Sequence, residues 1–512
     1  MSQSEAINAL AKGGRTNLLG LILRLAARVP FLFIAGRLYG PDIVGRYALA
    51  VLAIEFAALV STLGLKRGLA QALASTDRPH SHVVWDAMLV ALFAGLIAAL
   101  ALFFFPEAMY PNSRATGLEP LVGFVAIAIA WSDVSLAALA YRLNVAAQVK
   151  ARAVVEPWTI SIGAWLFHYV APQDGLILAY VASMVAALTA SLVPFVRTYG
   201  LPRGWHPRVV ELAALARRNA PLAGADTIEW ATRNVDRFIL GLLFAPAVVG
   251  VYYMAQQVAS IPQRLKSSFD PVLGPVLTQA LKNDDKPAMA QAVRQVGFWI
   301  MAAQAALALM FAIPAEGVMG LVGPQFVAGT GALCFLLVAE VLASTGAVCE
   351  AALVYIARHR NLAVSLCVLG TQIALSFALI FAMRALGWPL FYQATGTAVA
   401  LAVALTIGSL VKALMLRRML GASISNLRWP FLWALLAGGL VGAAFMTLPK
   451  HYEWIELSIG GPAILVTYLF VIIKWAFGPE DRALFRKMPS AEQLAGDMTL
   501  DSAEGRAAGA YR

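Results

Sequence analysis

The sequence predicts an all-α integral membrane protein with about 14 transmembrane helices, and three observations lead to this fold class. First, 60% of the 512 residues are hydrophobic and only 13% are charged, a composition typical of polytopic membrane proteins. Second, the 25 prolines and 40 glycines exceed what soluble helices accept, whereas membrane helices tolerate kinks and close packing. Third, a motif recurs in both halves of the chain, which predicts two parallel six-helix pseudo-repeats around a central cleft.

The first six apolar runs form the predicted N-terminal lobe, which covers residues 17–196 and follows a short cytoplasmic segment at 1–16. The first run holds Arg24 and Arg28 and lacks a small-residue cleavage site, so we expect a retained helix instead of a cleaved signal peptide. The expected helices of this lobe span residues 17–38, 44–65, 83–105, 121–141, 154–170 and 176–195.

A basic segment at 197–219 links the lobes, and its helical periodicity predicts a short interfacial or cytoplasmic helix. The C-terminal lobe covers residues 220–416, two further helices lie within 417–477, and the polar tail at 478–512 is expected to be disordered and cytoplasmic. The expected helices of these parts span residues 220–244, 248–273, 296–314, 326–357, 362–383, 390–416, 430–448 and 455–477.

The net charge of +11 would suit a nucleic-acid partner, but its distribution indicates a membrane topology instead. When the N-terminus is placed in the cytoplasm, nearly all lysines and arginines of the connecting segments fall on the cytoplasmic side. Such an asymmetry over short loops sets orientation, so it predicts two cytoplasmic termini and excludes a nucleic-acid partner. Cys334, Cys349 and Cys367 lie inside apolar runs without a CxxC spacing. We therefore expect small core side chains, with no disulfide, metal or cofactor.

The seventh apolar run carries an unusual stripe of charged residues. Asp226, Glu229, Arg233, Asp236 and Arg237 share one face of a helix, because positions three, seven, ten and eleven residues apart align. An ionisable group in hydrocarbon costs several kcal/mol unless it faces protein or water, so intramembrane charge by default marks a functional pathway. The sequence therefore predicts a functional site along this stripe.

The recurring motif is P-x-x-V-G-x-Y, which runs from Pro41 to Tyr47 and again, 205 residues later, from Pro246 to Tyr252. Carried into the preceding helices, the same offset superposes Arg28 on Arg233 and Arg24 on Glu229. Arg28 lies roughly 16 Å into its helix at 1.5 Å per residue, near the middle of the bilayer. Each half therefore places a cation at an equivalent depth.

Clustered arginines in a cleft suit an anionic ligand, above all phosphate, which guanidinium binds in a bidentate fork. We predict that Arg24, Arg28, Arg233 and Arg237 bind such a substrate. The accompanying acids are expected to line the cavity, orient the cations or carry a coupling proton. These acids are Asp226, Glu229, Asp236, Glu55, Asp86 and Asp133.

A purely structural interpretation remains open for each of these residues. Glu229 and Arg233 can form an intrahelical pair, and Arg24 and Arg28 can neutralise acids such as Glu55, Asp86 or Asp133. Motifs typical of hydrolases, nucleotide-binding proteins and metalloproteases do not occur in the sequence, so we expect no enzyme and assign no catalytic residue.

Two stretches resemble a known family. LYGPDIVGRYALAVLAIEFAALVSTLGL at 38–65 is similar to the N-terminal signature of bacterial polysaccharide and oligosaccharide flippases. NVDRFILGLLFAPAVVGVYYMAQQV at 234–258 is similar to the start of that family's second half. This is the Wzx-type branch of the multidrug/oligosaccharidyl-lipid/polysaccharide exporter superfamily, and the resemblance covers roughly residues 15–420.

The resemblance implies two six-helix lobes, a cationic central cavity and alternating access in the bacterial cytoplasmic membrane. Its members move an undecaprenyl-pyrophosphate-linked glycan to the outer leaflet for lipopolysaccharide, capsule or exopolysaccharide synthesis. Arg28 and Arg233, together with Arg24, would then contact the pyrophosphate. Membrane lipids, a polysaccharide polymerase and glycosyltransferases are the partners that this function implies.

Three other functions are weighed against the flippase. A cation-coupled multidrug exporter of the same fold would favour acids without paired arginines, because its substrates are cationic. A polytopic glycosyltransferase or ligase needs a large catalytic loop outside the membrane, whereas the outer loops here are short. A scaffold subunit would have little use for intramembrane charge.

Overall fold

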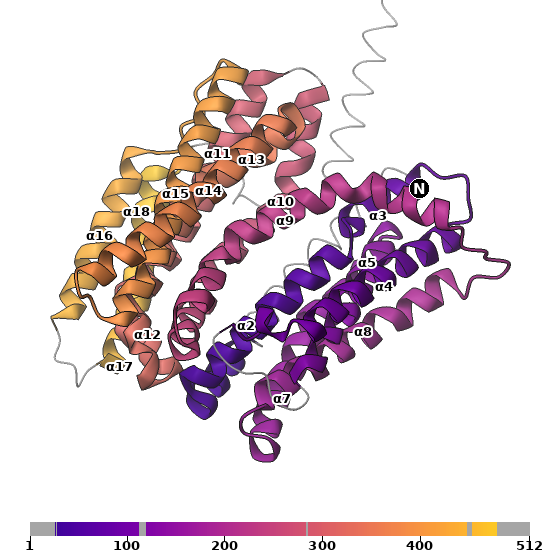
Figure 1. Cartoon of the computed structure of the whole chain (residues 1–512). Coiled ribbons are helices and arrows are strands. Elements are labelled where there is room, and N and C mark those ends of the chain that lie inside the picture. The colour runs from indigo at the N-terminus through magenta and orange to yellow at the C-terminus, as the bar shows by residue number, and fades with distance from the viewer. Residues whose placement is uncertain (1–25, 27, 112–118, 283–284, 448–452, 479–512) are drawn as a thin grey trace, which may run out of the picture.

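The computed structural model of the chain describes residues 26, 28–111, 119–282, 285–447 and 453–478. Every regular element among these residues is helical, which confirms the all-α fold class. Figure 1 shows an N-terminal lobe in indigo and purple and a C-terminal lobe in orange and yellow, with helices α9 (Val209–Leu243) and α10 (Pro246–Lys282) running between them.

Ten segments of the described chain are long and apolar enough to cross a membrane. The helices α9 and α10 are also long enough but carry too many polar residues to meet that criterion. The number of 14 membrane helices and the cytoplasmic position of the termini therefore remain predictions. Arg24 and the tail from 479 onward lie outside the described residues.

The first two expected spans of the N-terminal lobe, 17–38 and 44–65, meet at Gly40. Gly40 has a φ of +75°, which glycine adopts without strain, and Pro41 follows in the first turn of the next helix. The elements of this lobe are η1 (Ala35–Tyr39), α2 (Gly40–Ser61), α3 (Leu65–Ala74), α4 (His80–Phe104), η2 (Pro106–Ala108), η3 (Glu119–Phe124), α5 (Val125–Tyr141), α6 (Val145–Val149), η4 (Lys150–Val155), α7 (Glu156–Val170) and α8 (Gly175–Tyr199).

The C-terminal lobe packs α13 and α14 against α15, and adds a final antiparallel pair formed by α16 and α18. Its elements are α11 (Lys286–Ala312), α12 (Ala315–Val322), η5 (Pro324–Gly329), α13 (Thr330–Ile356), α14 (Arg358–Ala385), α15 (Leu390–Leu420), α16 (Trp429–Met446), α17 (Glu453–Ile455), η7 (Glu456–Gly460), α18 (Gly461–Val471) and η8 (Ile472–Ala476).

Two basic segments that the sequence assigned to loops are helical. Residues 65–74 form α3, because Leu65, Leu69 and Leu73 recur every fourth residue and are buried against the N-terminal lobe. Helical structure before the fifth expected span begins at Val145, so Arg152 lies within a continuous helical segment.

The linker also differs from the expected separate helix. Residues 209–219 are the first turns of α9 itself, and the chain passes through Pro221 without ending the helix. Leu212 and Leu215 pack on the N-terminal lobe, and this burial keeps the extension helical although proline removes one backbone hydrogen bond. As a result, α9 begins on one lobe and ends against the other.

The repeated motif is where the lobes come closest. A Cβ added at Gly45 would lie 1.7 Å from the carbonyl oxygen of Pro246, and one added at Gly250 would lie 2.0 Å from that of Pro41. Each motif therefore rests its glycine on the proline of the other motif, as two elements related by a two-fold axis would. Only glycine permits such a close approach of α2 and α10.

Further contacts close the same end of the molecule. Arg37 donates a hydrogen bond from Nε to the carbonyl oxygen of Leu321 at 3.1 Å. Gln325 donates one from Nε2 to that of Gly36 at 2.9 Å. Toward the opposite end, the ribbons of the two lobes diverge in Figure 1.

Candidate functional site

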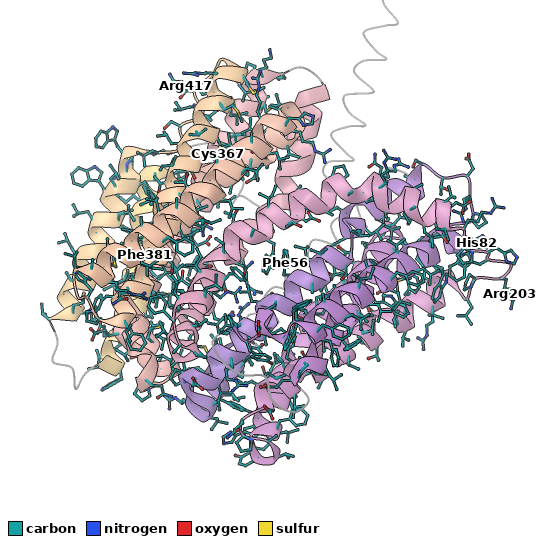
Figure 2. All side chains as sticks on the ribbon, viewed as in Figure 1. Phe56, His82, Arg203, Cys367, Phe381 and Arg417 are labelled. Carbon is teal, nitrogen blue, oxygen red and sulfur yellow. The ribbon has the colours of Figure 1, made fainter. Side chains whose placement is uncertain are left out.

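The helix α9 touches both lobes, so its charged stripe lies at their boundary. Near its start, Asn219 packs against Gly64 and Gly68 of the N-terminal lobe. Farther along, α9 packs against α14 and α15 of the C-terminal lobe. Between these regions Trp230 lies beside Phe56 of α2, with ring centroids 5.1 Å apart, and Figure 2 shows Phe56 between the two helices.

The first part of the stripe is paired with a cation from α3. Arg67 contacts Asp226 through Nε at 3.0 Å and Glu229 through Nη2 at 2.8 Å. Asp226 is buried, whereas Arg67 and Glu229 are exposed. This bridge attaches α9 to the N-terminal lobe, and Glu229 therefore contacts a cation outside its own helix.

The middle of the stripe faces the C-terminal lobe. Arg233 is exposed and lies 4.0 Å from Glu340 of α13. At that distance in an exposed setting the pair contributes little binding energy. Arg233 is therefore held less closely than Arg67, whose two ion-pair contacts are 3.0 and 2.8 Å.

The last part of the stripe is buried and polar. Asp236 is fully buried and accepts a hydrogen bond from the hydroxyl of Tyr252 at 2.6 Å and a longer one from Gln256 at 3.4 Å. Arg237 donates to Asn234, and its guanidinium lies over the ring of Tyr253, 5.5 Å from the centroid. Arg237 is thereby directed toward α10 and the lobe boundary.

Arg237 shares its surroundings with two charged residues of the N-terminal lobe. Glu55 of α2 lies within Coulombic range of both Arg237 and Arg28. Tyr253 lies within the same range of Arg28 and Arg237. Arg28 and Arg237 therefore reach a common region from opposite lobes, with the exposed carboxylate of Glu55 near both.

A group of tyrosines also joins the lobes. Tyr47 of α2 makes edge-on contacts with Tyr180 of α8 and Tyr253 of α10, with ring centroids 6.1 and 6.0 Å apart. All three are buried. Tyr47 and Tyr253 belong to the same helices as Gly45 and Gly250, so this aromatic cluster lies next to the glycine contacts of the closed end.

The structure holds Asp86 and Asp133 in ion pairs within the N-terminal lobe. Asp86 contacts Arg78 at 3.0 Å and accepts a hydrogen bond from Trp205 at 2.9 Å. Asp133 contacts Lys66 at 3.3 Å and also accepts from Arg152. These two acids are thus bound to cations other than Arg28.

Arg67 and Arg152 are cations of the boundary region that sequence reasoning assigned to topology-setting loops. Both lie in helical segments that were expected to be loops. Arg67 pairs with acids more than 150 residues away, and Arg152 pairs with Asp133 of α5 as well as with Glu156 one turn farther along its own segment. The spacing of Leu65, Leu69 and Leu73 was the one local signal that could have placed Arg67 on a helix.

Arg152 also supports a prediction about stability. It pairs with Asp133 and, at 2.7 Å, with Glu156, and the side chains of Arg152 and Asp133 are 17% and 16% exposed. We expect Arg152→Ala to lower the free energy of unfolding by about 3 kcal/mol, because both carboxylates lose their shared cation. Thermal unfolding of the purified protein in detergent measures this, with Arg197→Ala as the control at an exposed position. Equal melting temperatures for the two variants would contradict the prediction.

The arginines at the lobe boundary carry the kind of hydrogen-bond donors that an anion requires. They come from both halves of the chain, and the described residues contain no group of three or more His, Cys, Asp or Glu side chains positioned to hold a metal ion.

Comparison with solved structures shows where this fold occurs. The chain is similar to the lipid II flippase MurJ in an inward closed conformation, with a TM-score of 0.71 and 12% identity over 93% of this chain and 100% of that one. It is also similar to a MATE-family multidrug resistance transporter in an inward-facing conformation, with a TM-score of 0.60 and 15% identity over 78% and 98%.

A third similar structure is a transporter of the MOP superfamily from Pyrococcus furiosus, which is described as having a binding pocket of reversed polarity. Its TM-score is 0.56 at 14% identity, over 81% of this chain and 96% of that one. No curated protein sequence matches the chain.

The two-lobe helical fold, which the chain shares with these flippases and exporters, and its ten apolar segments define a multi-pass membrane protein. Residues 34–329, more than half of the chain, match the family described as polysaccharide biosynthesis protein. The chain belongs to that family.

Proposed function

We propose that this protein flips an undecaprenyl-pyrophosphate-linked oligosaccharide from the inner to the outer leaflet of the cytoplasmic membrane. The glycan would serve O-antigen, capsule or exopolysaccharide synthesis, supplied by glycosyltransferases and consumed by a polymerase. The observation that carries the proposal is the approach of Arg28 and Arg237 to Glu55 from opposite lobes, with Arg233 exposed on the same helix as Arg237.

The chemistry of the pyrophosphate explains why arginines would be needed. A guanidinium offers several N–H donors in a planar fork, which matches phosphate oxygens in a bidentate arrangement. In this proposal, Glu55 orients Arg28 and Glu340 orients Arg233 while the site is empty, and Asp226 and Glu229 hold Arg67. The pyrophosphate takes over the interaction with Arg28 and Arg233 on binding, and Arg24 would add to it.

The proposed movement follows from the contacts at the two ends. With the N-terminus in the cytoplasm, the end closed by Gly45 and Gly250 faces outward, and the diverging end faces the cytoplasm. The lobes 17–196 and 220–416 would then rock about the substrate. The linker 197–219 and the tail from 478 would remain on the cytoplasmic side, and the helices within 417–477 would remain outside the cleft. Asp236, buried and bonded to Tyr252, is the proposed carrier of a coupling proton.

The multidrug exporter is the second candidate, and the pairing of the acids argues against it. An exporter of organic cations needs carboxylates that are free to bind them. Here Asp226 and Glu229 share Arg67, and Asp133 is held by Arg152 and Lys66.

Reconstitution into vesicles tests the proposal directly. A fluorescent undecaprenyl-pyrophosphate oligosaccharide in the inner leaflet is expected to become accessible to an externally added lectin in vesicles that contain the protein, and to remain inaccessible in protein-free vesicles. Ethidium under an imposed pH gradient serves as the organic-cation substrate in parallel. Transport of ethidium without movement of the oligosaccharide would replace the flippase by the exporter.

A further inference from the structure

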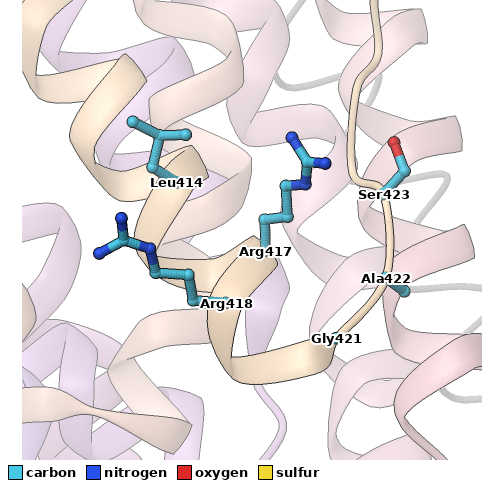
Figure 3. A pocket seen from close by; sticks show the side chains of 6 residues that line it. All are labelled: Leu414, Arg417, Arg418, Gly421, Ala422 and Ser423. Carbon is cyan, nitrogen blue, oxygen red and sulfur yellow. The ribbon is translucent and has the colours of Figure 1, made fainter.

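A second basic site lies away from the lobe boundary, at the end of α15. A cavity of about 440 Å³ is lined by Leu414, Arg417, Arg418, Gly421, Ala422 and Ser423. Figure 3 shows both arginines extending from the last turn of α15, with the Arg417 guanidinium toward the segment that carries Ser423 and the Arg418 guanidinium pointing away from it. We propose that this cavity binds the phosphate of an anionic phospholipid headgroup.

The charge of the cavity favours an anion. Arg417 and Arg418 are both exposed, and neither contacts a carboxylate of the described residues. The carboxyl end of a helix carries roughly half a negative charge, which is smaller than the two positive charges beside it. The cavity therefore keeps a net positive charge, which favours the binding of an anion.

The backbone adds to the shape of the site. Gly421 adopts a φ of +67°, a conformation that glycine takes without strain at a helix end. This turn brings Ala422 and Ser423 back alongside the last turn of α15, so that the Ser423 hydroxyl lines the same cavity as the guanidiniums. A phosphate there has hydrogen-bond donors from two sides.

The surrounding surface indicates that the phosphate belongs to a lipid. Along α15, Leu410 and Leu414 are exposed and lead up to the arginines. Trp429 and Trp433, in the first two turns of α16, are exposed as well, and tryptophans of this kind gather at the level of the headgroups. The exposed leucines next to the arginines offer a surface for acyl chains, and the exposed tryptophans at the start of α16 are of the kind that marks the headgroup level.

The chain provides a matched control for this proposal. Arg217 and Arg218 of α9 are also a consecutive exposed pair, on the side that is predicted to be cytoplasmic, and they do not line the cavity. Neither pair belongs to the proposed transport site. Replacing each pair by alanine removes the same charge and leaves only the cavity different.

Native mass spectrometry of the full-length protein with phosphatidylglycerol, phosphatidylcholine and inorganic phosphate tests the assignment. We expect phosphatidylglycerol to bind the wild type and the Arg217→Ala/Arg218→Ala variant alike. It should bind the Arg417→Ala/Arg418→Ala variant about 30-fold more weakly, because each basic residue at an anionic membrane surface contributes about a fivefold gain in affinity. Ser423→Asp, which retains both arginines, should also weaken binding and covers the case in which the double variant is poorly folded.

Three results would overturn the proposal. These are equal binding of phosphatidylglycerol to the wild type and the Arg417→Ala/Arg418→Ala variant, an equal loss in the control pair, and binding of phosphatidylcholine as tight as that of phosphatidylglycerol. Retention of inorganic phosphate that phosphatidylglycerol cannot displace would assign the cavity to a soluble phosphate instead. Because the vesicle assay of glycan movement does not involve these residues, failure of one proposal leaves the other standing.

Discussion

Arg28→Ala and Arg233→Ala are each expected to abolish glycan export, and lysine at either position to restore part of it. The reason is that, under the proposed function, each alanine removes a bidentate phosphate-binding group from one lobe, whereas lysine keeps the charge but loses the fork geometry. Surface polysaccharide, measured together with the amount of protein in the membrane, reports the effect. The prediction applies to the two residues as a set, because they occupy equivalent positions of the repeat.

Arg197→Ala is the matched control for these variants. Arg197 is an exposed arginine in the last turn of α8, so its loss changes the net charge equally without touching the lobe boundary. Normal surface polysaccharide in both alanine variants, at normal protein levels, would rule out the assigned role of Arg28 and Arg233.

Gly45→Ala and Gly250→Ala are expected to stop transport by preventing closure of the outer end. The new methyl group would lie 1.7 Å from the Pro246 oxygen in one case and 2.0 Å from the Pro41 oxygen in the other, whereas real Cβ contacts are essentially never shorter than 3.0 Å. Since both obstacles are backbone atoms, α2 and α10 must separate, and the protein should favour states in which its outer end is open.

Cysteine labelling measures this separation. In a protein whose three native cysteines are replaced by alanine, Gln325→Cys at the closed end should react faster with a membrane-impermeant maleimide when Gly45→Ala or Gly250→Ala is present. Gly439→Ala in α16 is the control, because nothing lies within 4 Å of its added Cβ. Unchanged labelling together with normal export would show that the glycine contacts are not part of the closure.

The family relationship, the glycine variants and the arginine variants each concern a different property of the protein. The match at residues 34–329 places the chain in the polysaccharide biosynthesis protein family. The glycine pair concerns how the lobes meet, and the arginines concern what they bind. A variant that loses export with unchanged labelling at position 325 would therefore report on binding, and one that changes both would report on closure.

The sequence by itself determined the fold class, the repeat and the position of the charged stripe. Hydropathy, helical periodicity and the recurrence of P-x-x-V-G-x-Y are properties of short stretches, so they can be recognised without knowing which helices meet. The amphipathic spacing of Leu65, Leu69 and Leu73 was also present, but the neighbouring charges of Lys66 and Arg67 favoured a loop. The helix there depends on burial against the rest of the lobe.

Only the tertiary structure decided which charges meet. Arg67 contacts Asp226 and Glu229 across more than 150 positions of sequence, and Arg152 holds Asp133 from another helix. Such pairs depend on where helices cross, which local patterns do not encode. The same holds for the repeat. Its glycine was visible in the sequence, but the reason for the glycine was not. Gly45 contacts Pro246 and Gly250 contacts Pro41 only once the two lobes are packed together.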